Sequence, residues 1–126
     1  MKFRYAAATD IGICRRRNED AVLLRPRQRL VVVADGLGGH DSGDLASSIA
    51  VREVGAALRG PGTQDDAQRL RDALRGAHDT IIQAAQAHGS SMATTAVVAW
   101  LRGRVAHVAH VGDSRVYRIR NHVMEQ

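Results

Sequence analysis

Cysteine, aromatic residues and long apolar runs are all scarce in this chain of 126 residues, and each scarcity excludes a class of protein. Cys14 is the only cysteine, so the chain has no internal disulfide and no thiol cluster for zinc. We therefore expect a reducing, cytoplasmic location. No segment reaches the roughly 18 consecutive apolar residues of a membrane span, and the N-terminus lacks the apolar stretch of a signal peptide. We expect a soluble protein with no membrane partner.

Aromatic residues make up 3% of the chain, whereas apolar residues together make up 44%. The core is therefore expected to consist mainly of Val, Ala, Leu and Ile. Basic residues outnumber acidic ones by 18 to 13, which gives a formal net charge of +5. These basic residues are scattered, with no run of five or more, and few aromatic rings are present to stack on bases. We expect no nucleic-acid partner.

The spacing of apolar residues predicts one domain that contains both strands and helices. The predicted strands are residues 3–13, 21–24, 30–34, 94–101, 105–111 and 114–120. The last three would form a meander, and the valine-rich segment 30–34 would be buried. Helices are predicted at residues 44–58 and 66–88, where apolar residues recur at three- and four-residue steps. This order predicts an α+β fold with antiparallel pairing and both helices on one sheet face.

Acidic residues and glycines follow the ends of predicted strands in three segments. These segments are residues 15–20, 35–43 and 111–115. Each alone is compatible with an ordinary polar turn, but together they favour carboxylates that meet at one sheet edge. Mg²⁺ and Mn²⁺ prefer oxygen ligands, so such a cluster is a candidate metal site. The candidate ligands are the side chains of Glu19, Asp20, Asp35 and Asp113 and the backbone carbonyl of Gly36.

Four motifs resemble those of the PPM (type 2C) family of metal-dependent protein serine/threonine phosphatases. Residues 15–21 (RRRNEDA) resemble R-x-x-N-E-D-A, and residues 35–47 (DGLGGHDSGDLAS) resemble the bacterial D-G-M-G-G-H-x-x-G-x-x-A-S. Residues 94–96 (TTA) resemble part of G-T-T-A, and residues 111–117 (VGDSRVY) resemble V-G-D-S-R-x-Y. The motifs occur in the family's order, so residues 1–126 are interpreted as the N-terminal portion of a single PPM-type domain. The resemblance implies an α-β-β-α sandwich, here expected to be incomplete.

The resemblance also implies roles for the candidate ligands. Asp35 would bridge two Mg²⁺ or Mn²⁺ ions, and Glu19 and the Gly36 carbonyl would hold one of them. Asp20 would orient metal-bound water. Asp113 would belong to a third, weaker metal site.

The implied reaction is hydrolysis of phosphoserine and phosphothreonine in proteins by a metal-activated water. Arg15 would bind the phosphate, because a planar guanidinium matches two phosphate oxygens at once. The implied partners are phosphorylated Ser/Thr proteins and a cognate Ser/Thr kinase. Leu37 stands where some eukaryotic members have a histidine that acts as general acid, and His40 does not inherit that role by position.

The main alternative is a catalytically inactive remnant or a phosphoprotein-binding module. Family members continue beyond the segment that matches Gln126 into further aspartate motifs that complete the metal site. We therefore expect residues 1–126 alone to bind Mn²⁺ or Mg²⁺ weakly and to hydrolyse an aryl phosphate slowly or not at all. Dinucleotide binding and serine-hydrolase chemistry are excluded because neither G-x-G-x-x-G nor G-x-S-x-G occurs.

Two further patterns have plainer interpretations. Arg25, Arg27 and Arg29 are interpreted as a solvated loop edge, with docking of a phosphoprotein as the less favoured alternative. His107 and His110 lie an odd number of residues apart on a predicted strand, so their side chains would point to opposite faces rather than share a metal.

Overall fold

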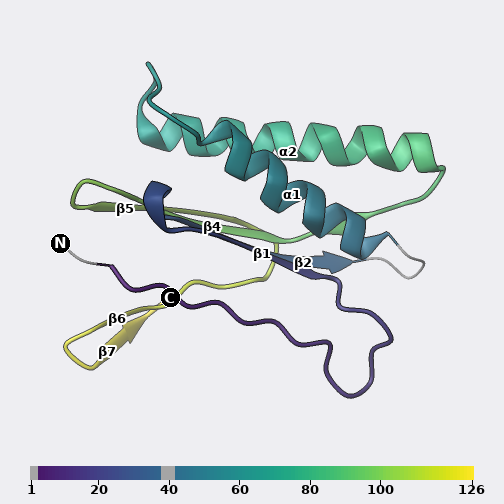
Figure 1. Ribbon diagram of the computed structural model, residues 1–126, viewed down its shortest axis with the longest axis horizontal. Helices are drawn as coiled ribbons and strands as arrows, with labels where there is room; N and C mark the ends of the chain where they lie inside the picture. The colour runs from purple at the N-terminus through teal and green to yellow at the C-terminus, as the bar shows by residue number, and fades with distance from the viewer. Residues whose placement is uncertain (1–2, 38–41) are drawn as a thin grey trace.

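The computed structural model describes residues 3–37 and 42–126 and shows an antiparallel sheet with two helices on one face (Figure 1). The strand order of the sheet is β1 (Asp20–Arg25), β2 (Leu30–Leu37), β4 (Ala96–Arg102), β5 (Val105–Val111). A short strand, β3 (Ala93–Thr94), pairs with the end of β2. The helices are α1 (Gly43–Ala57) and α2 (Asp66–His88). The predicted α+β fold, its antiparallel pairing and the packing of both helices on one face are confirmed.

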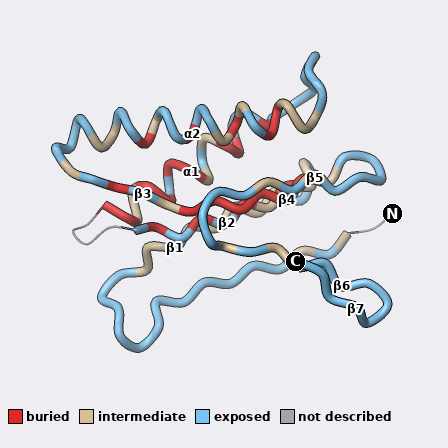
Figure 2. Tube along the Cα trace, turned by 180° about the vertical axis from the view of Figure 1, so that it is seen from behind, coloured by how far each residue is buried: buried red, intermediate tan, exposed pale blue. Residues whose placement is uncertain are grey.

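Strand β2 is the centre of the domain because it pairs with β1 on one side and with β4 on the other. Its side chains alternate: Leu30, Val32 and Ala34 are fully buried beneath the helices, while Val33 on the opposite face is 38% exposed. On the same opposite face Val108 of β5 is 48% exposed. These exposed valines match the expectation of an incomplete sandwich. Figure 2 shows that the chain segments below the sheet, including the two C-terminal strands at Arg118–Arg120 and Val123–Glu125, are themselves exposed and do not form a second layer.

The core lies between the sheet and the two helices. Val98 and Trp100 of β4 pack there with apolar residues of both helices, including Val54 and Leu70, and with Leu58 directly after α1. Trp100 is 1% exposed. Two arginine side chains, Arg69 and Arg102, stack on its ring with centroid distances of 4.8 and 4.9 Å. The only tryptophan of the chain is therefore a core residue whose edge meets a basic surface.

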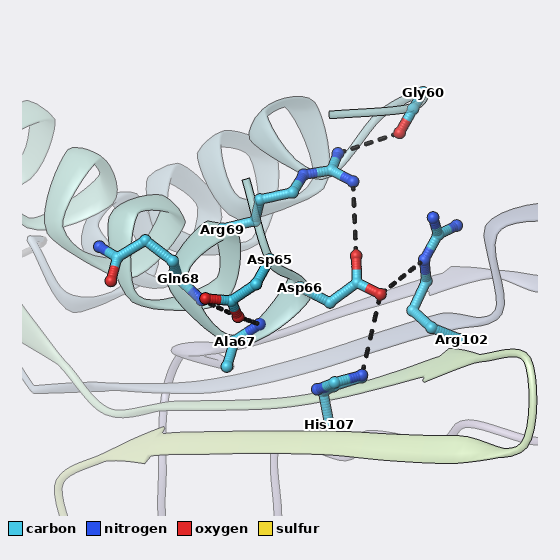
Figure 3. A network of polar contacts seen from close by, with 8 residues as sticks. All are labelled: Gly60, Asp65, Asp66, Ala67, Gln68, Arg69, Arg102 and His107. Atoms are coloured by element: carbon cyan, nitrogen blue, oxygen red, sulfur yellow. Dashed lines mark hydrogen bonds and ion pairs between the residues drawn. The ribbon is translucent and has the colours of Figure 1, made fainter. Parts of the chain in front are cut away.

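Helix α2 has defined signals at both ends. The Asp65 carboxylate accepts hydrogen bonds from the backbone N–H groups of Ala67 (2.7 Å) and Gln68 (3.0 Å), which caps the N-terminus (Figure 3). Those same hydrogen bonds hold the pKa of Asp65 below its ordinary value. Gly89 ends the helix with a φ of 60°, a conformation that a side chain disfavours. No helix in the described ranges combines the length and apolarity that crossing a bilayer requires.

The strand predicted at residues 3–13 is wrong. This segment runs extended below the sheet in Figure 1, but no described strand pairs with it and most of its side chains are exposed. Alternating apolar residues indicate an extended segment, but they do not show whether a neighbouring strand is available. A strand needs such a partner for its backbone hydrogen bonds.

The predicted C-terminal meander is also wrong. Residues 112–117 leave the sheet after β5, and only β6 (Arg118–Arg120) remains of the strand predicted at 114–120. It pairs instead with β7 (Val123–Glu125), which the sequence did not predict, in a separate hairpin. Asn121 and His122 both have positive φ, and this suits the two-residue turn that closes such a hairpin.

Other boundaries differ by small amounts. A 3-10 turn at Pro26–Gln28 joins β1 to β2. Strand β2 runs to Leu37 rather than ending at Ala34, because its last two residues pair with β3. The predicted strand 94–101 is divided at Thr95 into β3 and β4. Gly38, Gly39 and His40 of the second motif lie outside the described residues.

Candidate active site

The pairing of β1 with β2 places Asp20 directly opposite Asp35 at one end of the sheet. Both line a pocket of about 190 Å³. The pocket is also lined by Asp10, Ile11, Arg15, Arg17, Asn18 and Glu19. Strand pairing and the loop before β1 thus bring the first two motif segments together in one small cavity.

The two paired aspartates repel each other. Desolvation raises the pKa of Asp35 above its ordinary value, and the charge of Asp20 and a hydrogen bond between the two side chains raise it further. Arg15 acts in the opposite direction, and the more distant charge of Asp113 again raises the pKa. The site therefore holds more negative charge than Arg15 neutralises, although Asp35 stays largely accessible to solvent.

Arg15 and Glu19 form an ion pair at the rim of the pocket. Their side chains approach to 3.1 Å, with 66% of the Arg15 side chain exposed but only 16% of that of Glu19. Arg15 thus faces solvent above the carboxylates, where an incoming anion would meet it first. The pair keeps a cation beside the acidic pocket without filling the pocket.

Two glycines permit the close approach of the chain segments that form the pocket. The Gly36 N–H donates to the backbone carbonyl of Glu19 at 3.1 Å. A Cβ atom on Gly36 would overlap the carbonyl oxygen of Gly43 and lie 2.7 Å from that of Glu19. A Cβ atom on Gly43 would lie 2.7 Å from Oε1 of Glu19. Larger residues at either position would displace the loop that carries Glu19.

Thr94 and Thr95 hold the backbone of Asp35 from the other side. The Asp35 N–H donates to Oγ1 of Thr95 at 3.0 Å, and the Asp35 carbonyl accepts from the Thr95 N–H at 2.9 Å and from Oγ1 of Thr94 at 3.0 Å. Oγ1 of Thr95 also lies 2.7 Å from the hydroxyl of Ser114. The third and fourth motifs therefore support the position of Asp35. We call these contacts the threonine clamp.

Thr9, Asp10 and Asn18 also belong to the neighbourhood of the site, and sequence reasoning assigned them no role. Asn18 accepts from the Asp20 N–H at 3.0 Å and donates to Oγ1 of Thr9 at 2.8 Å, and Thr9 donates to the Asp20 carboxylate at 3.4 Å. Asn18 lies within the first motif, and this position could have indicated its role. No motif contains Thr9 or Asp10, and their segment was interpreted as a strand.

Asp113 lies outside this pocket. It lines a neighbouring pocket of about 350 Å³ together with His110, Ser114 and Arg115. Among the described residues, its links to Asp35 are its charge and the hydrogen bond of the adjacent Ser114 to the threonine clamp. Its predicted part in a third metal site stays a prediction.

The donor set suits a hard divalent cation but is only part of a site. Glu19, Asp20 and Asp35 offer carboxylate oxygens at one pocket, and the raised pKa of Asp35 marks negative charge that a cation would offset. Within residues 3–37 and 42–126, no three His, Cys, Asp or Glu side chains converge closely enough to hold an ion by themselves. Further oxygen ligands, from water or from other residues, would be needed.

The Protein phosphatase 2C family matches residues 15–125, so this chain belongs to that family. Its sequence is 35% identical to serine/threonine phosphatase stp of Listeria monocytogenes over 127 residues, which is 94% of this chain and 50% of the relative. The chain spans about half the length of that curated relative.

Solved structures agree with the family. The fold matches the crystal structure of the Mycobacterium tuberculosis serine/threonine phosphatase PstP/Ppp with a TM-score of 0.90 at 31% identity, covering 98% of this chain and 52% of that one. A structure of the catalytic domain of PstP in complex with two manganese ions matches with a TM-score of 0.87 at 32% identity, covering 96% and 53%. At identities of 31% and 32%, the similarity to these structures includes the sequence as well as the fold.

Proposed function

We propose that the protein containing this chain is a metal-dependent phosphatase that hydrolyses phosphoserine and phosphothreonine in proteins. The observation that supports this most is the placement of Asp20 opposite Asp35 in one pocket with Arg15 at its rim. The two manganese ions of the related PstP structure support the choice of cofactor. Residues 1–126 would form the N-terminal portion of a single catalytic domain.

Each residue of the pocket would contribute a separate part of the chemistry. Asp35, Asp20, Glu19 and the Gly36 carbonyl would hold Mg²⁺ or Mn²⁺, and the ions would supply an activated water and neutralise charge on the phosphoryl oxygens. The threonine clamp would keep Asp35 at a fixed distance from Asp20. Asp20 would orient the attacking water through its accepting oxygens. No side chain of this chain is required to form a covalent intermediate.

Arg15 would bind the phosphate of the substrate. Its guanidinium is exposed, lies beside the carboxylates and presents donors that match two phosphate oxygens. Because its present ion-pair partner is Glu19, phosphate and Glu19 would compete for it unless Glu19 turns to a metal ion. Metal binding would therefore release Arg15 for substrate.

Several finer features follow from the same proposal. Substrates would be phosphorylated Ser/Thr proteins supplied by a cognate kinase in a signalling pathway, and Asp113 would hold a third ion. The exposed, unpaired thiol of Cys14 favours a reducing compartment such as the cytoplasm. No described contact favours the inactive-remnant alternative over the enzyme.

The test is hydrolysis of a phosphothreonine peptide by the full-length protein, with and without Mn²⁺ or Mg²⁺. We expect turnover that requires the metal, falls by about a hundredfold or more in Asp35→Asn and shows a raised KM in Arg15→Ala. A folded full-length protein that binds Mn²⁺ but hydrolyses no phosphopeptide would overturn the proposal and favour the remnant.

A further inference from the structure

A third pocket, of about 350 Å³ and distinct from the one that Asp113 lines, lies at the other end of β2. It is lined by Arg27, Gln28, Arg29, Leu58, Gly60, Trp100, Leu101, Arg102 and Gly103. These residues come from three places that Figure 1 shows at the same end of the domain: the 3-10 turn, the segment after α1 and the β4–β5 turn. Three of them are arginines and none is acidic. We call this cavity the distal arginine pocket.

The three guanidinium groups of this pocket are not consumed by other contacts. For Arg27, no hydrogen bond or ion pair of the side chain is present in the described part of the chain, and Arg29 stacks on Phe3 at 4.9 Å, which leaves its donors free. Arg102 turns only its Nε to Asp66, at 3.3 Å. Figure 3 shows its two terminal nitrogens pointing away from Asp66. Several charged donors therefore remain at the rim of the pocket.

The indole of Trp100 gives independent evidence that an acceptor belongs here. Its Nε1 is buried and has no hydrogen-bond acceptor among the described residues. Buried N–H donors nearly always have a partner, because leaving one unpaired costs the full desolvation of the group. Nε1 has almost no accessible surface, so a ligand with several acceptor oxygens would serve the arginines directly and would reach the indole only after a small movement of the side chains around it.

Nearby acids are already engaged. Asp66 lies within 4 Å of three cationic or titratable groups, Arg69 (3.7 Å), Arg102 (3.3 Å) and His107 (3.8 Å) (Figure 3). Backbone carbonyls in the last turn of α1 and after it are engaged too, since Arg25 donates to Gly55 at 3.2 Å and Arg69 donates to Gly60 at 2.9 Å. The local field at the pocket is therefore positive.

We propose that the distal arginine pocket is a binding site for an oxyanion of the phosphate class, separate from the carboxylate pocket. Leu30 and Asp35 are five positions apart on β2, so the two pockets lie roughly 17 Å apart at about 3.3 Å per residue. Guanidinium forks match phosphate oxygens geometrically, and the volume is at the small end of ligand pockets, enough for a phosphate with its attached side chain. The ligand is either free phosphate or a phosphate carried by a polypeptide. This proposal stands on its own geometry and does not require catalysis.

The experiment uses Trp100, because it is the only tryptophan and gives a single indole N–H resonance. Residues 1–126 are titrated with inorganic phosphate at constant ionic strength, and separately with a phosphoserine peptide and its unphosphorylated form. We expect the indole resonance to shift saturably with phosphate and with the phosphopeptide only. Tighter binding of the phosphopeptide would identify a chain-borne phosphate as the ligand, and tighter binding of inorganic phosphate would identify the free ion.

Matched variants locate the effect. Arg27→Gln and Arg102→Gln should each weaken the saturable shift by about tenfold, since each removes a charge-assisted donor. Arg104→Gln is the control, because Arg104 is an exposed arginine of the same β4–β5 turn that does not line the pocket. Should Arg102→Gln unfold the chain, Arg27→Gln alone decides, since Arg27 is exposed. A shift that does not saturate, or one equally affected by all three variants, would overturn the proposal.

Discussion

Strand β2 ends in opposite chemistry at its two ends, and the contacts there differ in kind. At the Asp35 end, two carboxylates face each other, and desolvation together with the charge of Asp20 raises the pKa of Asp35. At the Leu30 end, two of the arginines are partnered: Arg69 and Arg102 stack on Trp100 and share the carboxylate of Asp66. The basic end is stabilised by its own contacts, whereas the acidic end is held together against its own charge.

This difference indicates that the acidic end of β2 lowers the stability of the fold, as is expected for a binding site. The carboxylates stay close together at the acidic end because backbone contacts hold them there. On one side Gly36 packs closely against Gly43, and on the other side the threonine clamp holds the backbone of Asp35. Like charges this close persist only where surrounding contacts hold them in place, and a bound cation would offset their repulsion. The following substitutions test that contrast.

The largest effect is expected for Gly36→Ala. The added methyl would overlap backbone atoms of Gly43 and Glu19, which no side-chain rotation relieves. We expect a loss of about 3 kcal/mol or more in the free energy of unfolding, measured by urea denaturation. Gly76→Ala is the matched control: it lies within α2 with no atom near its Cβ position, and it should gain about 0.5 to 1 kcal/mol. Equal stability of the two variants would show that the close approach is not required.

The next largest effect is expected for Thr95→Val. Valine keeps the shape but removes the acceptor of the Asp35 N–H and the partner of Ser114, which should cost about 1 to 3 kcal/mol. Thr95→Ser retains the hydroxyl and serves as the control. Amide hydrogen exchange of Asp35 should accelerate in the valine variant and stay slow in the serine variant. Unchanged protection of Asp35 in Thr95→Val would refute the threonine clamp.

At the basic end, Asp66→Asn should be destabilising by about 1 kcal/mol. The carboxylate serves two guanidinium groups and lies in the first turn of α2, where negative charge is favourable. The change would be measured by thermal unfolding at low and high salt, and the cost should shrink at high salt. A neutral result at both salt concentrations would mean that stacking on Trp100, rather than the ion pairs, holds these arginines.

At the acidic end, Asp35→Asn should have the opposite and the smallest effect. Without metal, we expect the free energy of unfolding to rise by under about 1 kcal/mol, because the site is open to solvent. The folded-state pKa of Asp35 lies above its ordinary 3.8, so the folded chain binds more protons between these two values. Stability of the wild-type chain therefore falls as pH rises through that window and stays lower above it. The gain should be complete at neutral pH and vanish below pH 3.8. A loss of stability at pH 7 would contradict the contrast.

Much of the fold was predictable, for identifiable reasons. The predicted bounds of α2 agree with the structure to the residue, because Asp65 and Gly89 mark its ends. The predicted bounds of β5 agree as well, because a glycine turn precedes it. The strand predicted at residues 3–13 was wrong because a sequence pattern does not reveal whether a partner strand exists. The predicted meander was wrong for a related reason, since β6 pairs with β7 across the Asn121–His122 turn instead.

For the candidate site, the sequence located the segments but not the contacts between them. The four motifs contain Asp20, Asp35 and Thr95, yet the hydrogen bond from Asp35 to Thr95 spans sixty positions and depends on how β3 joins β2. The resemblance assigned Asp113 to a separate, weaker site, and the turn after β5 places it in a different pocket from the other acids. The arginines at the other end were interpreted as a solvated edge, because nothing local links residues 27–29 to the turn at 102–103.

The most direct test of the account is where Mn²⁺ binds. Adding substoichiometric Mn²⁺ to the isotope-labelled chain broadens the nuclear resonances close to the ion most strongly. We predict that the signals of Glu19, Asp20, Asp35 and Gly36 broaden first, that the Trp100 indole at the other end of β2 broadens last, and that Asp35→Asn abolishes the selective effect. Broadening centred on Asp66 and His107, or spread evenly over the chain, would contradict the claim that this end of β2 is the metal-binding part of a phosphatase site.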